Sequence, residues 1–77
     1  MKTEGKKSTI ENAKIVEYHK KIASHLEEAA KKHRKAAKFH GSGDHDKACS
    51  SLVNAHSHLV LAAEVQTEML KHPMFTS

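Results

Sequence analysis

The chain has few of the residues that small proteins use to reinforce a fold. Among its 77 residues are one cysteine, Cys49, one proline, Pro73, two phenylalanines, one tyrosine and no tryptophan. A single cysteine excludes an intramolecular disulfide and a zinc site built on paired thiolates. Scarce aromatic residues disfavour a β-sheet or a large mixed core. A chain of this length rarely buries enough apolar surface without some reinforcement, so we expect the fold to depend on another layer.

Long apolar runs are also missing. The longest strongly apolar stretch covers positions 59–63, whereas a membrane-spanning helix needs about 20 apolar residues. Positions 1–8 are charged and are followed by no apolar run of the length of a secretory signal. Together with the single free thiol, this predicts a cytoplasmic protein that does not span a membrane.

The positions of glycine and proline predict two long helices. Neither residue occurs between positions 9 and 40, and Ser8 to Glu11 matches the capping box that starts a helix. Gly41-Ser42-Gly43-Asp44 predicts a turn in which Gly41 supplies the left-handed cap and Asp44 or Asp46 caps the second helix. The predicted fold is all-α, a long antiparallel hairpin of helices 9–40 and 45–71. We divide this single domain, 1–77, into a flexible segment 1–7, helix 8–40, turn 41–44, helix 45–71 and tail 72–77.

Heptad repeats predict which residues join the two helices. In the first helix, rows that begin at Ile15, Val16 and His19 repeat every seven residues on one side. The predicted seam of the second helix consists of Ala48, Leu52, Ala55, Leu59, Ala62, Gln66 and Met69. In a tight hairpin, the numbers of facing residues add up to roughly 85, which places His33 near Leu52 and Leu26 near Leu59.

A second apolar surface is expected on the second helix. Leu61 and Val65 lie roughly opposite the predicted seam, and His58 belongs to the same region. A segment that is apolar nearly all round requires neighbours on two sides. We therefore expect a homodimer of hairpins that forms a four-helix bundle, with Leu61, Val65 and His58 at its interface. The alternative is that Leu61 and Val65 are isolated apolar surface residues.

Histidine is unusually frequent. The eight histidines lie at positions 19, 25, 33, 40, 45, 56, 58 and 72. No two are three or four residues apart, so no single helix presents a metal-binding pair. A zinc, nickel or copper site could form between helices, from His33 and His56 across the seam, from His40 and His45 beside the turn, or from identical histidines of two copies at the axis of a symmetric dimer. The alternative is that His19, His33 and His56 are buried seam residues with hydrogen bonds to the neighbouring helix.

A cluster of basic residues follows in the first helix. Lys31, Arg34, Lys35 and Lys38 project from it as one patch, which could bind phosphate groups. The alternative is a solvated helix end whose cations offset the helix dipole. Because only Phe39 could stack on a base, nucleic-acid binding is the weaker interpretation.

The sequence contains no catalytic motif. It has no glycine-rich phosphate loop and no nucleophile elbow. Cys49, which has His45 and His56 near it in the sequence, is better interpreted as a small apolar seam residue than as a catalytic thiol. We expect a protein without enzymatic activity and without a resident cofactor.

Two resemblances concern the centre of the chain. The runs 29–40 and 41–48, with Gly43-Asp44-His45 at the turn, resemble small bacterial proteins rich in histidine and alanine whose function is uncharacterised. This resemblance implies a pair of histidine-rich helices, and it does not supply an activity. The turn is also similar to that inside a tetratricopeptide repeat, but these helices are longer and no second copy follows. The predicted function is association with itself or with another protein, with histidine-based metal binding as the alternative.

Overall fold

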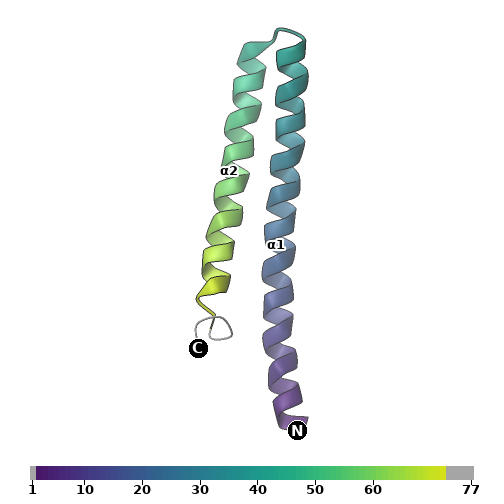
Figure 1. Ribbon diagram of the computed structural model, residues 1–77, viewed down its shortest axis with the longest axis vertical. Helices are drawn as coiled ribbons and strands as arrows, with labels where there is room; N and C mark the ends of the chain where they lie inside the picture. Colours follow the sequence, from purple (N-terminus) through teal and green to yellow (C-terminus); the bar gives the residue numbers. More distant parts are fainter. Residues whose placement is uncertain (1, 73–77) are drawn as a thin grey trace.

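The computed structural model describes residues 2–72, and the side chains of residues 12–72. Two helices account for nearly all of this part of the chain, α1 (Lys2–Gly41) and α2 (His45–Leu70). They lie side by side and antiparallel, joined by one short turn (Figure 1). The predicted all-α hairpin is therefore confirmed. The molecule measures 62 × 18 × 11 Å, and the first turns of α1 extend past the end of α2 (Figure 1).

The first helix begins earlier than the capping box predicts. α1 already includes Lys2, so positions 2–7 are helical rather than a flexible segment. Gly5 is a poor helix former, but a single glycine costs only about 1 kcal/mol, and no proline blocks the helix there. α2 ends at Leu70, one residue before the expected boundary. Pro73 and the rest of the expected tail, 73–77, lie outside the described residues.

The turn is built by backbone hydrogen bonds that end α1. The Asp44 amide donates to the Phe39 carbonyl at 2.8 Å, and the Gly43 amide donates to the His40 carbonyl at 3.1 Å. This pair of bonds defines a Schellman motif, which requires a left-handed residue at its fifth position. Gly43 is that residue, with φ of 82°, whereas Gly41 is still helical. The expectation that Gly41 takes the left-handed conformation is therefore wrong.

Asp44 begins the second helix. One oxygen of its carboxylate, Oδ1, accepts a hydrogen bond from the Lys47 amide at 3.1 Å, and Oδ2 lies 3.7 Å from the Lys47 ammonium. Of the two candidate caps, Asp44 is therefore the one used, and Asp46 lies in the first turn, where its charge favours the helix dipole.

The seam between the helices follows a strict alternation of three and four residues. In α1 the partly or fully buried positions of this seam are 15, 18, 22, 25, 29, 32, 36 and 39. In α2 they are 48, 51, 55, 58, 62, 65 and 69, and position 72 continues the row just after the helix ends. This is the a and d pattern of a coiled coil. Its buried residues are mostly small: Ala29, Ala36, Ser51, Ala48, Ala55, Ala62 and Met69.

The observed seam differs from the predicted one by a rotation of each helix. The a row, from Ile15 to Ala36 and from Ala48 to Met69, was predicted and is confirmed. The second row is d, which contains Tyr18 and His25, rather than the rows of Val16 and His19. His19, His33 and His56 are exposed instead of buried, and so are the predicted seam residues Leu26, Leu52 and Leu59. The most apolar stripe of each helix is thus only partly used by the hairpin.

Candidate functional site

One long side of the hairpin is exposed and carries no formally charged residue. It consists of the residues at heptad positions e and b, in the repeat whose a and d positions form the seam. In both helices these residues lie on the same side of the seam. In α1 they are Val16, His19, Ala23, Leu26, Ala30, His33, Ala37 and His40, and in α2 they are His45, Cys49, Leu52, His56, Leu59, Ala63, Gln66 and Leu70. All sixteen are exposed. We call this surface the neutral face.

The two halves of the neutral face lie on the same side of the molecule. When two helices pack antiparallel, the residues at e in one helix meet those at e in the other. The contact of His40 with His45, both at e, is the first such pair, with Nδ1 atoms 3.2 Å apart. Continuing this register places His33 beside Leu52 and Leu26 beside Leu59. The face is therefore one continuous strip rather than two separate stripes.

Its composition is unusual for an exposed surface. Charged residues make up 29% of the chain, so about five would be expected among sixteen surface positions, and there are none. Leu26, Leu52 and Leu59 expose 41–51% of their surface near the centre of the strip. A contiguous exposed apolar surface of this kind is more often a binding site than a surface that stays in contact with solvent.

The opposite side carries most of the charge. Its g and c positions include Lys14, Glu17, Lys21, Glu28 and Lys31 from α1, Lys47, Glu64 and Glu68 from α2, and Lys71 directly after α2, all with side chains at least partly exposed. We call it the charged side. Lys31 pairs there with Glu28 at 3.8 Å.

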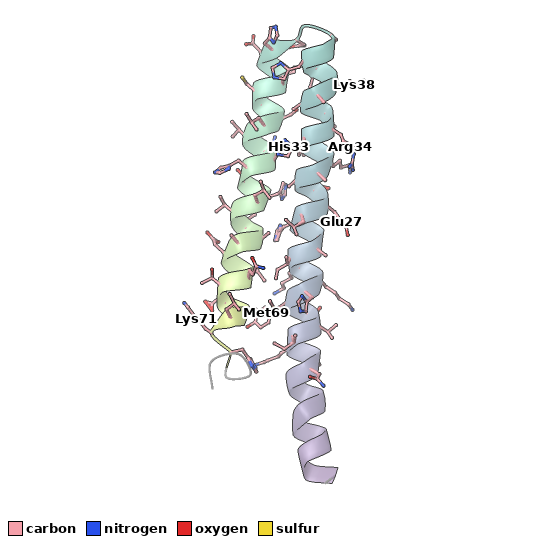
Figure 2. The ribbon with its side chains drawn as sticks, viewed as in Figure 1. Glu27, His33, Arg34, Lys38, Met69 and Lys71 are labelled. Carbon is pink, nitrogen blue, oxygen red and sulfur yellow. The ribbon has the colours of Figure 1, made fainter. Side chains whose placement is uncertain are left out.

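The predicted basic patch is exposed, as expected. Lys31, Arg34, Lys35 and Lys38 lie on the charged side or on the outer edge of α1. Figure 2 shows Arg34 and Lys38 pointing away from α2, whereas His33 points toward it. The patch therefore lies away from the neutral face, and phosphate binding by it stays a prediction.

The residues expected at an oligomer interface do not share one surface. His58 and Val65 are half-buried in the seam at d positions, so they belong to the hairpin itself. Leu61 is exposed, but its g position places it on the charged side. The three residues therefore do not assemble into the interface that the sequence predicted.

The structure brings four histidines together in two pairs. His40 and His45 meet beside the turn, with ring centroids 5.3 Å apart. His25 and His58 meet in the seam, with centroids 5.9 Å apart. His33 and His56 form no such pair among residues 12–72, because His56 lies at b, one row farther from the seam. Of the two predicted metal pairs, the structure thus brings together only His40 with His45.

The His25–His58 pair was missed by the sequence reasoning. Both residues occupy d positions. The d row contains several polar residues, so hydrophobicity alone does not identify it as part of the seam. The alternation of three and four residues around the alanine row could have revealed it, because 25 lies between 22 and 29 and 58 lies between 55 and 62. Nδ1 of His58 is buried and has no hydrogen-bond partner within the described part of the chain.

Comparison with protein-family models, with curated proteins and with solved structures found no match. Within residues 2–72, neither helix is long and apolar enough to cross a membrane. Over the same residues, no three side chains from histidine, cysteine, aspartate and glutamate converge as ligands for one ion.

Proposed function

We propose that this protein acts without catalysis, as a helical module that associates with a second copy of itself through the neutral face. Two hairpins closed on each other in this way form a four-helix bundle. The observation that carries the proposal is the strip of sixteen exposed positions without a charged residue, centred on Leu26, Leu52 and Leu59. A charged side chain in such a strip would have to be desolvated on association, at considerable cost.

The small core of one hairpin supports this proposal. Over the described residues, the buried apolar side chains are five alanines and Met69, and no large side chain is fully buried. Each ordered residue costs about 1.5 kcal/mol of conformational entropy, and alanine offers little apolar area to offset it. A second hairpin would bury the leucines that the first leaves exposed, at up to about 2 kcal/mol each.

The accessible surface is large enough for a second layer to pack on the hairpin. The chain exposes 5936 Å², whereas a compact monomer of 8.5 kDa exposes about 4,650 Å². The excess of about 1,300 Å² exceeds the roughly 800 Å² per partner of a stable interface. A two-fold axis through the neutral face pairs an uncharged strip with an identical one, so no charge is left unpaired.

Two leucines of α2 provide a matched test. Leu59 and Leu61 are each 41% exposed, but Leu59 lies on the neutral face and Leu61 on the charged side. We expect light scattering coupled to size exclusion to give twice the chain mass for the natural protein at about 100 μM. Leu59→Glu should give a monomer, because it places a charge in the interface. Leu61→Glu should stay dimeric.

The opposite pattern would contradict the proposal. A natural protein that is folded and monomeric over the whole concentration range has no self-association to explain. Dissociation by Leu61→Glu, with Leu59→Glu still dimeric, would place the interface on the charged side. A monomer that gains helix content only with another protein would mean that the neutral face binds a different partner.

A further inference from the structure

The second function that the structure suggests lies at the turn. His40 ends the e row of α1 and His45 begins that of α2, and their Nδ1 atoms are 3.2 Å apart. Nitrogens bound about 2.0–2.1 Å from a tetrahedral metal ion are about 3.3 Å apart. We propose that His40 and His45 form a two-histidine site for a divalent transition-metal ion, which links α1 to α2 beside the turn.

The backbone around the pair is already held in place. The His40 carbonyl accepts a hydrogen bond from the Gly43 amide, and the Asp44 amide is bonded to the Phe39 carbonyl. His45 is the first residue of α2, directly after the Asp44 cap. Because both ends of the turn are fixed, the two rings can turn toward a shared ion by side-chain rotation alone. Pre-organised ligands of this kind reduce the entropy cost of binding.

The protonation states of the rings permit binding. In the contact itself, one Nδ1–H donates a hydrogen bond to the other Nδ1. A neutral imidazole can carry its proton on Nε2 instead, which leaves Nδ1 free as a ligand. Binding therefore moves one proton from Nδ1 to Nε2 through solvent and releases none from neutral rings. Imidazolium rings must lose a proton first, so the affinity falls with decreasing pH.

The nearby polar groups limit the site to two protein ligands. The Asp44 carboxylate caps α2 and faces Lys47, and no third ligand converges on the pair among the described residues. Water fills the other coordination positions. Such a site favours ions that bind imidazole strongly, with Cu²⁺ above Zn²⁺ and Ni²⁺. Both protein ligands come from one chain, at the turn end of the neutral face, so a bound ion would add charge at the edge of the proposed dimer interface.

Zinc titration of the full chain tests this site. The Cys49→Ser variant removes the exposed thiol, which would otherwise compete for zinc. Imidazole ¹H–¹⁵N spectra should show the Nδ1 resonances of His40 and His45 shifting together and saturating at about one zinc ion per chain. The thermal midpoint should rise as zinc is added, because the ion binds only the folded hairpin.

Four alanine variants separate the pair from the other histidines. His40→Ala and His45→Ala should each lower zinc affinity about tenfold or more, since either change leaves a single ligand. His33→Ala and His56→Ala are matched controls on the same face and should bind as before. Equal losses in all four variants would mean adventitious binding only and would overturn the site. So would unchanged affinity in His40→Ala and His45→Ala, or no binding by the Cys49→Ser protein.

Discussion

At the scale of single residues, the seam contains polar side chains at positions where leucine would pack. Lys32 and His25 are half-buried at d positions of α1, and Ser51 and His58 occupy the corresponding row of α2. Lysine can bury its alkyl stem here while its ammonium group reaches solvent. Histidine has no such freedom, and Nδ1 of His58 is left without a partner among the described residues. A buried unpaired polar atom costs about 1–3 kcal/mol.

His58→Leu should therefore stabilise the protein. The change removes the unpaired nitrogen and adds apolar contact in the seam, so the free energy of unfolding should rise by about 1–2 kcal/mol. Urea denaturation followed by circular dichroism, at one fixed protein concentration, measures it. Asn54→Leu is the control, because it adds a leucine to an exposed g position of α2. A loss of stability in His58→Leu alone would show that the contact with His25 outweighs the unpaired nitrogen.

At the scale of elements, the turn sets the register of the whole hairpin. The Schellman bonds to Phe39 and His40 end α1, and the Asp44 cap starts α2 three residues after Gly41. Every facing pair along the seam, from His40 with His45 to His25 with His58, follows from this spacing. A change in the turn should therefore affect the stability of both helices together.

The two glycines of the turn should respond in opposite ways to alanine. Gly43→Ala should lower the free energy of unfolding by about 1–2 kcal/mol, because φ of 82° is unfavourable for any residue with a Cβ atom. Gly41→Ala should raise it by about 0.5–1 kcal/mol, since Gly41 is helical and an added Cβ meets nothing within 4 Å. Thermal unfolding of the two variants measures both. Equal effects of the same sign would contradict the assignment of Gly43 as the left-handed residue.

Much of the fold was predictable because its signals are local. The absence of glycine and proline from positions 9–40, the turn residues and the Asp44 cap each report on their own segment of the chain. The choice of left-handed glycine was wrong because both Gly41 and Gly43 fit the pattern. Only the two backbone bonds to Phe39 and His40 distinguish them.

The orientation of the seam was not predictable in the same way. The apolar stripe of α1 spans the a, e and b rows, so it is wider than one neighbouring helix can cover. Periodicity finds the centre of that stripe, near Leu26, whereas the hairpin packs along its edge and recruits His25 and Lys32 from the d row. The seam lies away from its predicted position and the neutral face stays exposed for the same reason: the apolar stripe is wide enough to contact two neighbouring helices.

At the scale of the whole molecule, the two long sides of the hairpin differ in charge. The neutral face contains five of the eight histidines and no lysine, arginine or carboxylate, while the charged side contains most of the lysines and glutamates. A dimer closed through the neutral face leaves the basic patch of Lys31, Arg34, Lys35 and Lys38 on its outside. Any phosphate binding by that patch would be compatible with the dimer.

Self-association should weaken as the pH falls. The neutral face contains five histidines, His19, His33, His40, His45 and His56, and a histidine ring can take up a proton and become charged. A proton on any of these rings would place a charge in the interface, where it would have to be desolvated, so acidification should favour dissociation. We expect the dissociation constant from sedimentation equilibrium to increase about tenfold or more when the buffer is changed from about pH 7.5 to about pH 5.5.

Removing two of these rings should reduce the effect. A variant with both His33→Gln and His56→Gln keeps polar side chains on the face but removes two groups that gain charge. Its dissociation constant should change less with pH than that of the natural protein. The same pH dependence in both proteins would show that the titrating groups lie elsewhere.

The contact between two copies is measured most directly by isotope-filtered NMR. A mixture of ¹³C-labelled and unlabelled protein yields nuclear Overhauser effects that arise only between protomers. If the neutral face is the interface, methyl groups of Leu26, Leu52 and Leu59 should give such signals and those of Leu61 should give none. Signals between protomers at Leu61, with none at Leu52 or Leu59, would contradict the central claim.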